Sequence, residues 1–447
     1  MSSTTTLFAS SSSSSSSSHP LPPQLLNSWR PYSPNHQNAA FSSSHCNNRA
    51  TTLKLLSLSS KTTWKNCRTL AALPFDLSPP PIDHDLLDTV ATEGAEVSED
   101  GIVETFGNDD EALEAVHTGV VVVDLSHFGR IRVSGDDRIQ FLHNQTTANF
   151  ECLHDGQGCD TVFVTPTART IDIAHAWIMI PLLYSQKNAV NLVVSPVTCQ
   201  SITEMLKKYI FFTDKVEIQD ITKQTCFFVL VGPKSNQLIE DLNLSGLVGQ
   251  PYGTHQHFSV NGMPITVGVG NVISEEGFSL LMSPAAAGSV WKTLLSQGAI
   301  SMGSNAWEKL RVLQGRPAPQ KELTNEYNVL EAGLWNSISL SKGCYKGQET
   351  ISRLITYDGV KQRLWGISLS AAAEPGSPIM VGGKKVGKLT SCVPGKMGSQ
   401  GHVGLGYIKR QAASKGDTVI IGDSVTGTVI EVPYIARQNP PSKSTNS

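Results

Sequence analysis

A short segment, Lys342 to Glu349, combines one cysteine with two glycines and two lysines. Ile351, Leu354 and Ile355 follow at the spacing of one apolar helix face, which predicts a helix directly after the segment. Ammonium groups and a helix N-terminus both stabilise a thiolate, so Cys344 is a candidate reactive thiol. It could be a nucleophile, a transient ligand of iron or sulfur, or a redox-sensing group. The alternative is a small buried thiol in a glycine-rich turn.

The residue order of this segment resembles the Lys-Gly-Cys-Tyr-x-Gly-Gln-Glu motif of the YgfZ-type folate-binding proteins. These proteins are relatives of the glycine-cleavage T-protein, an aminomethyltransferase, and act in iron–sulfur cluster assembly or repair. The resemblance implies that tetrahydrofolate or a derivative is the cofactor and that Cys344 supplies the reactive thiol.

Four shorter fragments resemble T-protein patterns in the same order along the chain. They are Asp124-Leu125-Ser126-His127, Val231-Gly232-Pro233, Glu275-Glu276-Gly277-Phe278 and Leu389-Thr390-Ser391. The resemblance extends from about Glu104 to about Arg437. It implies an α+β fold with a T-protein-like folate-binding region around a central cavity, followed by a small C-terminal antiparallel β-barrel.

Folate recognition calls for a carboxylate, because the pterin ring presents a ring N–H beside an exocyclic amino group and a carboxylate accepts both. Glu275 falls on the family's Glu-x-Gly position and is the candidate for this role. The other interpretation is a surface glutamate in a turn, solvated like its neighbour Glu276.

Asp172 is the second carboxylate of interest, within a stretch of strand character. In T-proteins the corresponding segment carries two glycines followed by a pair of aspartates, one of them catalytic. Here Ala168-Arg169 replaces the glycines and Ile173 replaces the second aspartate. Asp172 is therefore a candidate catalytic residue, or else a strand carboxylate paired with a neighbour such as Arg169. The missing residues argue against aminomethyl transfer.

Several further residues are candidates for contacts with the cofactor, because they are polar, cationic or aromatic and lie near these motifs. They are Asn325 and Tyr327 in a segment that crosses the cavity mouth in the family, Arg311 as a cation for the glutamate tail of folate, and Lys342, Tyr345 and Gln348 in the cysteine segment. Lys321 and Arg353 are alternative cations. Each of these residues has an equally simple structural interpretation.

The eight cysteines include no Cys-x-x-Cys pair and no Cys/His cluster with zinc spacing. The sequence therefore predicts neither a metal site built by the protein alone nor a disulfide framework.

The N-terminal part contains no Asp or Glu before Asp76 and includes a serine run from Ser10 to Ser18. This composition predicts a disordered transit peptide over residues 1–70. Abundant serine and sparse arginine favour the chloroplast stroma over the mitochondrion; a cytosolic tail is the alternative. Removing its six basic residues would change the formal charge from -3 to -9, which argues against nucleic-acid binding. No apolar run is long enough to span a membrane.

Hydrophobic periodicity and turn residues divide the remaining chain into four parts. We expect a linker with a helix over 71–103, the folate-binding region over 104–357, the β-barrel over 358–437 and a disordered tail over 438–447. Within them, 161–165 and 170–177 are predicted to form a hairpin, and 384–386 and 388–391 to be separate strands. A monomer is expected.

Three hypotheses for function follow. The first is a plastid folate-dependent protein that supports iron–sulfur cluster assembly or repair, with client or assembly proteins as partners. The second is a tetrahydrofolate-dependent aminomethyltransferase. The third is a scaffold of the same fold without a ligand, for which no residue gives positive support.

Overall fold

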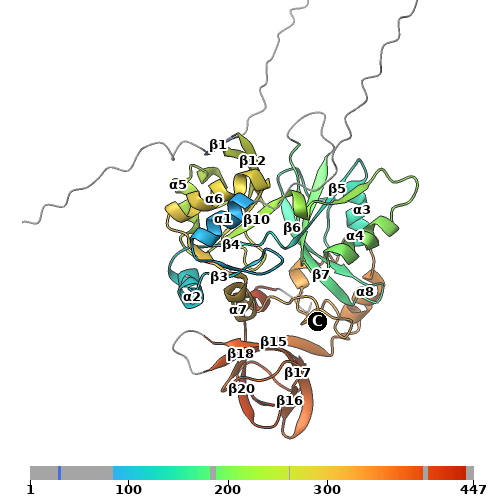
Figure 1. Cartoon of the computed structure of the whole chain (residues 1–447). Helices are drawn as coiled ribbons and strands as arrows, with labels where there is room; N and C mark the ends of the chain where they lie inside the picture. Colours follow the sequence, from blue (N-terminus) through green and yellow to red (C-terminus); the bar gives the residue numbers. More distant parts are fainter. Residues whose placement is uncertain (1–28, 32–83, 182–187, 261, 396–400, 439–447) are drawn as a thin grey trace, which may run out of the picture.

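The computed structural model describes residues 29–31, 84–181, 188–260, 262–395 and 401–438 (Figure 1). Most of the predicted transit peptide and the last nine residues of the predicted tail lie outside this part. Within it, two β-sheets flanked by helices stand side by side, and a β-barrel lies below them in the view of Figure 1.

The larger sheet has seven strands in the order β1-β11-β12-β13-β10-β4-β14. Their bounds are β1 (Trp29–Pro31), β4 (Val121–Asp124), β10 (Cys226–Val231), β11 (His255–Val260), β12 (Met263–Val269), β13 (Phe278–Met282) and β14 (Ile300–Met302). Neighbours are antiparallel except for the parallel pair of β14 and β4.

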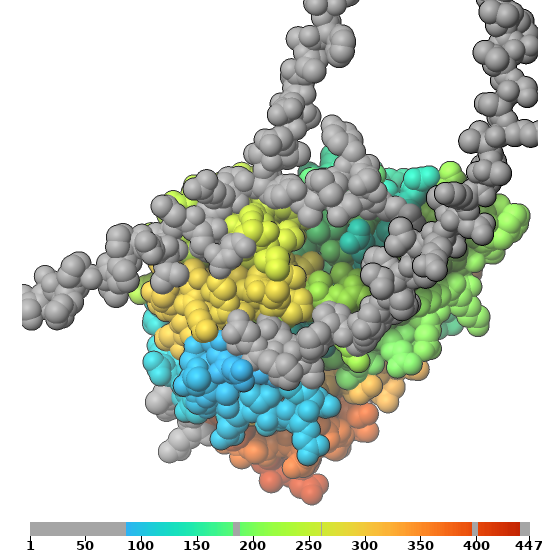
Figure 2. Space-filling view, turned by 45° about the horizontal axis from the view of Figure 1, so that its top comes forward, coloured from blue at the N-terminus to red at the C-terminus, as the bar shows by residue number. Residues whose placement is uncertain are grey.

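Helices cover both faces of this sheet, which explains why every residue of β10 is buried. One core lies under α1 (His84–Thr92), α5 (Ser235–Asp241) and α6 (Pro284–Ser296) and receives Phe228 and Leu230. The other lies under α2 (Asp109–Thr118) and α7 (Ser304–Gln314) and receives Phe227 and Val229, as expected from the alternation of side chains along a strand. Figure 2 shows the N-terminal helical segment in blue against the yellow segment that contains α6.

The smaller sheet has the order β6-β7-β8-β5-β9 and is entirely antiparallel. Its strands are β5 (Gly129–Ser134), β6 (Gly158–Val164), β7 (Thr170–Ile178), β8 (Ala189–Val194) and β9 (Glu217–Asp220). Helices α3 (Arg138–Gln145) and α4 (Cys199–Lys208) pack on one face. The predicted hairpin is confirmed as β6 and β7.

The C-terminal strands form a closed antiparallel barrel, which confirms the predicted fold. They are β15 (Gln362–Leu369), β16 (Pro378–Val381), β17 (Lys384–Pro394), β18 (His402–Lys409), β19 (Thr418–Ile421) and β20 (Val425–Ile430). The prediction of two strands at 384–386 and 388–391 is wrong, because Gly387 does not break β17. A Cβ at Gly387 would lie 2.1 Å from the Tyr407 carbonyl oxygen, so glycine is there to allow the close approach of β18.

The chain between α7 and the barrel crosses the junction of the three parts. It contains η3 (Trp335–Ser337) and ends in α8 (Gln348–Thr356), the helix predicted after the cysteine segment; the barrel is followed by α9 (Pro433–Ala436). The shorter elements are β2 (Glu96–Val97), β3 (Val103–Thr105), η1 (Thr222–Gln224) and η2 (Ser245–Leu247). One apolar cluster joins Val162 of β6, Leu330, Tyr407 of β18 and Ile435 of α9, so the barrel shares a core with the α+β region.

Candidate functional site

A central cavity of about 160 Å³ lies between the two sheets and the chain end at α9. Its polar lining residues include Asp160 of β6, Tyr252, Asn271, Glu275, Tyr434 of α9 and Arg437. The cavity therefore draws its walls from distant parts of the sequence.

Asp160 belongs to a network of buried and half-buried aromatic and polar side chains. The Tyr252 hydroxyl donates to Asp160 Oδ1 at 2.7 Å, and His175 Nδ1 lies 2.9 Å from the same oxygen. Behind the ring, Trp177 Nε1–H donates to His175 Nε2 at 2.6 Å. Because Nε2 accepts this bond, neutral His175 carries its proton on Nδ1 and donates it to Asp160.

These contacts keep Asp160 ionised at neutral pH. Burial raises its pKa, but the hydrogen bonds from His175 and Tyr252, together with the positive charge of Arg316, outweigh burial and lower the pKa below its usual range. Burial and the nearby Asp160 raise the pKa of Tyr252 well above its usual value. The Oδ2 atom of Asp160 takes part in no hydrogen bond with the described residues, so the carboxylate has one oxygen available to a ligand.

Arg316 follows α7 and brings a positive charge to the same region. Its side chain is only 7% exposed, yet its guanidinium has no hydrogen bond or ion pair within the described ranges. At Asp160, Tyr434 and Asp172, burial acts to raise the pKa. The positive charge of Arg316 opposes the effect of burial at each of these groups and acts to lower the pKa. The Tyr434 hydroxyl is also buried without a partner. Unsatisfied buried donors are costly and mark a place for a polar ligand or water.

Glu275, the predicted folate carboxylate, lies exposed at the rim of this cavity. Asn271 shapes its turn by accepting the N–H groups of Ile273 and Ser274 on Oδ1, each at 2.9 Å. Arg437 holds the turn from the other side through a 2.8 Å bond to the Ile273 carbonyl. The structure thus brings Glu275 to the same cavity as Asp160, and both interpretations of Glu275 remain open.

Asp172, the other predicted carboxylate, is fully buried and is not among the residues that line the central cavity. Its Oδ1 accepts the Ile173 N–H at 2.8 Å, and its Oδ2 accepts the Ser195 N–H at 2.8 Å and the Thr198 hydroxyl at 2.5 Å. Burial outweighs these bonds and raises its pKa. In this position Asp172 ties β7 to the chain that leads into α4.

The suggested pair of Asp172 with Arg169 is wrong. Arg169 Nη1 instead donates to the Glu326 carbonyl at 2.8 Å and lies 4.0 Å from a Glu331 carboxylate oxygen. Its contacts therefore lie in the chain between α7 and the barrel, called the crossing segment below. They are away from Ser195 and Thr198, which bind Asp172.

The cysteine segment forms a tight loop that precedes α8, as predicted. Gly347 has a φ of 85°, and a Cβ there would lie 2.9 Å from the Thr165 carbonyl oxygen, so both conformation and space favour glycine. The Gln348 side chain accepts the Tyr345 N–H at 3.3 Å and closes the loop. Cys344 is exposed as a free thiol, which places it at the surface.

Lys342 attaches the loop to the end of α3. Its buried ammonium donates to the carbonyls of His143, Thr146 and Ala148 at 2.5, 2.8 and 2.6 Å, at the C-terminal end of α3. These bonds use all three donors of the ammonium. Burial lowers its pKa to about 8. The ring of Tyr345 lies 4.6 Å from the nitrogen, and burial raises the pKa of that tyrosine to about 12.

Lys346 also makes contacts away from the thiol. Its nitrogen lies 3.1 Å from Met205 Sδ and 4.5 Å from the centre of the Tyr209 ring. Both ammonium groups of the segment thus contact residues other than Cys344. Of the two features predicted to stabilise a thiolate, only the N-terminus of α8 remains near Cys344. No residue of the segment lines the central cavity.

Arg311, the predicted cation for the folate tail, is buried and has its donors occupied by protein. It donates to both oxygens of Glu308 at 2.8 Å, to Glu322 at 3.0 Å, to the Arg316 carbonyl at 2.5 Å and to the Ser391 hydroxyl at 3.3 Å. Burial lowers its pKa, but the bonds to Glu308 and Glu322 outweigh it and raise the pKa. Arg311 joins α7 to the barrel.

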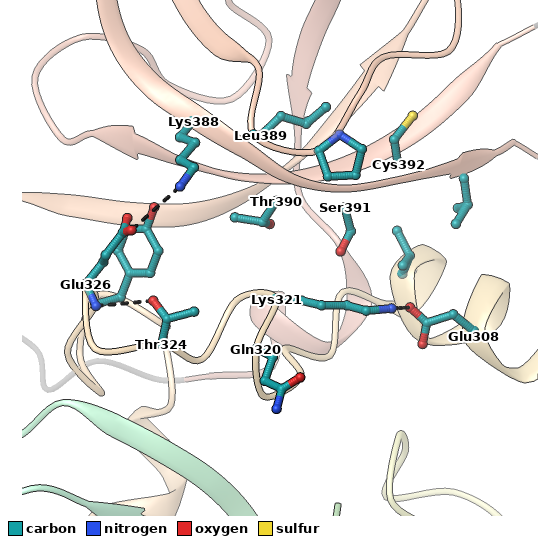
Figure 3. Close-up of a pocket in the computed structure, with 15 residues that line it drawn as sticks. Glu308, Gln320, Lys321, Thr324, Glu326, Lys388, Leu389, Thr390, Ser391 and Cys392 are labelled. Atoms are coloured by element: carbon teal, nitrogen blue, oxygen red, sulfur yellow. Dashed lines mark hydrogen bonds and ion pairs between the residues drawn. The ribbon is translucent and has the colours of Figure 1, made fainter. Parts of the chain in front are cut away.

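A second cavity, of about 550 Å³, separates the crossing segment from β17 (Figure 3). Lysine–glutamate pairs stand at its sides: Lys321 lies 2.6 Å from Glu308, and Lys388 lies 3.6 Å from Glu326. Its lysines thus already have carboxylate partners.

Tyr327 and Asn325 lie on the crossing segment. Tyr327 lines the second cavity, but its ring is stacked on Tyr407 at 3.5 Å, so one face is already covered. Asn325 is exposed. The structure therefore places neither residue in the central cavity with Glu275.

All six cysteines in the described ranges are free thiols, and only Cys152 and Cys344 among them are exposed. In these ranges no three His, Cys, Asp or Glu side chains are grouped so that they could hold a metal ion. No helix there is long and apolar enough to cross a membrane.

Comparison with known proteins places this geometry in context. Residues 103–342 match the family of the GCVT N-terminal domain. An Arabidopsis thaliana protein, named as a candidate chloroplastic transferase, is 72% identical over 376 residues, which are 84% of this chain and 85% of the relative. An aminomethyltransferase of Rippkaea orientalis is 25% identical over 338 residues, 73% of this chain and 89% of the relative.

The fold is similar to a solved structure as well. The crystal structure of the glycine cleavage system aminomethyltransferase T from Bartonella henselae matches with a TM-score of 0.67 and 17% sequence identity. The match covers 78% of this chain and 97% of the other. It confirms the T-protein-like fold, while the YgfZ-type branch stays a prediction.

Proposed function

Because this chain belongs to the GCVT family of aminomethyltransferase-like proteins, we propose that it is a folate-dependent protein of the YgfZ type. Its role would be to support iron–sulfur cluster assembly or repair in the chloroplast stroma. The acid-free N-terminal part and the chloroplastic Arabidopsis relative support the location. The motif from Lys342 to Glu349 supports the iron–sulfur role.

The proposal of folate binding depends on one observation: the central cavity contains both a hydrogen-bond acceptor and a hydrogen-bond donor. The ionised Asp160 offers an acceptor, and the Tyr434 hydroxyl offers a donor without a partner among the described residues; Arg316 does not line the cavity, but its positive charge acts on both groups. A reduced pterin presents N–H groups on one edge and a carbonyl oxygen beside them, so it suits a cavity with both kinds of group. A volume of about 160 Å³ is below the roughly 300–1,000 Å³ of a typical ligand pocket. The cavity would therefore hold the ring system and leave the glutamate tail outside.

The thiol part depends on a different property. Cys344 is exposed on a loop whose backbone is fixed by Lys342 and Gly347, so another protein can reach the sulfur atom without unfolding the loop. Client or assembly proteins for iron–sulfur clusters would meet the chain here.

Aminomethyl transfer is the second candidate, favoured by the names of the relatives. Against it stands the position of Asp172. Its carboxylate is bonded to the Ser195 and Thr198 groups, and the second aspartate of the T-protein pattern is Ile173. We therefore rank this activity second.

A genetic test separates the two. The chain from residue 71 would be expressed in a bacterium that lacks its YgfZ-type protein, as wild type, as Cys344→Ala and as Cys152→Ala, which removes the other exposed thiol. Activity of a cluster-dependent enzyme should return with the wild type and Cys152→Ala only. Thermal unfolding and binding of 5-formyltetrahydrofolate should be the same for all three.

Other results would change the proposal in defined ways. Rescue by Cys344→Ala would keep the iron–sulfur role and remove the thiol from it. No rescue by soluble, folate-binding wild type would contradict the iron–sulfur role and direct the assay to folate-dependent aminomethyl transfer.

A further inference from the structure

A groove of about 890 Å³ lies where α8, β15 and α9 meet, at the mouth of the barrel. Its apolar walls come from Leu354 and Ile355 of α8, Trp335 of η3, Trp365 of β15 and Ile435 of α9. It is separate from the central cavity, with which it shares only Gln438.

Two partly exposed indoles give this groove flat walls. Trp365 lies on the same face of β15 as Ile367 and Leu369, which pack inside the barrel, and it contacts that core itself. Trp335 packs against the cluster that joins the barrel to the α+β region. Both rings are thus supported from behind and stay partly exposed in the groove; one face of Trp365 is covered by Arg363, so an aromatic ligand would meet Trp335 and the exposed part of Trp365.

Arg363 supplies the polar group. Its guanidinium stacks 4.4 Å from the centre of the Trp365 ring, and no hydrogen bond or ion pair engages it within the described part of the chain. The nearby Glu431 is paired with Lys415 at 2.6 Å. Arg363 therefore keeps its donors for an acceptor from outside.

The other arginine in the groove differs in this respect. Arg410 lies 2.5 Å from Asp358, so its charge is already balanced by a carboxylate. Among the described residues, the groove thus offers apolar surfaces and, in Arg363, a cation without a hydrogen bond or ion pair.

We propose that this groove binds a small aromatic carboxylate, with its ring against the indoles and its carboxylate on Arg363. The volume of about 890 Å³ lies within the roughly 300–1,000 Å³ of small-molecule sites. This site depends neither on folate in the central cavity nor on Cys344.

Two matched probes test the proposal by calorimetry on the chain from residue 71. 1-Naphthoate carries the anion, and 1-naphthamide has the same ring system without the charge. Naphthoate should bind at one site, and Arg363→Gln should weaken it about tenfold, the loss of one charge-assisted hydrogen bond. The same change should alter the affinity for naphthamide by less than about twofold. Trp365→Leu should lower the affinity for both probes.

Control variants and outcomes keep the test decisive. Arg410→Gln should change naphthoate affinity by less than about twofold, and Arg363→Lys should retain part of it because the charge stays. Thermal unfolding checks that every variant is folded. The absence of naphthoate binding, equal binding by Arg363→Gln, or displacement of naphthoate by saturating 5-formyltetrahydrofolate would each overturn the proposal.

Discussion

The central cavity and the Lys342–Glu349 loop use charged side chains in different ways. In the cavity, Asp160 and Tyr434 keep hydrogen-bonding capacity that no described residue uses. In the loop, the Lys342 ammonium donates all three of its hydrogen bonds to backbone carbonyls, and the thiol of Cys344 is exposed. Under the proposed function, the cavity completes its hydrogen bonds with a small molecule, whereas the loop holds the Cys344 sulfur atom in place for a larger partner.

Lys342→Met removes the ammonium that holds the loop, and we expect it to have the largest effect on the free energy of unfolding. It leaves three buried carbonyls without a donor, so the free energy of unfolding should fall by about 3 kcal/mol or more. Urea unfolding measures the change. Lys346→Met is the matched control, because that ammonium contacts only a sulfur atom and a ring face, and it should cost less than about 1 kcal/mol. Equal costs for the two variants would show that the carbonyl contacts do not hold the loop.

The loop was the part of the site that the sequence could predict. Its residues are contiguous, so the motif and the helix after it follow from neighbours in the chain. The fate of the two ammonium groups could not be predicted, because the carbonyls that bind Lys342 are almost 200 residues away.

The cavity was largely missed for the same physical reason. Asp160 and Tyr252 are 92 residues apart, and nothing local marks either as a partner of the other. Arg311 was predicted as a cation and Arg316 was not, because only the tertiary structure shows that Arg311 is fully bonded while the Arg316 guanidinium has no hydrogen bond among the described residues. Among the strands, β11 was not predicted, because the polar residues His255, Gln256 and His257 interrupt the alternation of apolar and polar side chains. Its strand conformation depends on pairing with β12.

A pH profile tests the packing that supports the cavity. His255 is buried against Trp177, donates from Nδ1 to the Gly253 carbonyl at 3.1 Å, and has a buried Nε2 without a hydrogen-bond partner among the described residues. Burial, the largest cause, lowers its pKa from 6.5 to about 4. Between these values the unfolded chain binds a proton that the folded chain does not, so stability should fall as the pH drops from 6.5 to 4.

His255→Gln should remove this part of the profile. At pH 4 the histidine accounts for up to about 3 kcal/mol of lost stability, so the variant's free energy of unfolding should fall less steeply with acid than that of the wild type. Urea unfolding at several pH values between 4 and 7 measures the difference. Parallel profiles would mean that His255 takes up its proton in the folded state.

The cavity side of the comparison is sharpened by asking which carboxylate holds the ligand. Asp160 is fixed and ionised by His175 and Tyr252, whereas Glu275 is exposed at the rim and needs to become ordered on binding. If Glu275 is the pterin partner, Glu275→Gln should weaken binding of 5-formyltetrahydrofolate by roughly 1–3 kcal/mol in calorimetry, and Asp160→Asn should have less effect. If the preorganised carboxylate is the partner, the order reverses, because Asp160 loses no side-chain freedom on binding. Arg316→Gln should weaken binding in either case, and unchanged affinity in all three variants would move the ligand out of this cavity. The sizes of the two carboxylate effects therefore decide whether the motif or the buried network recognises the ring.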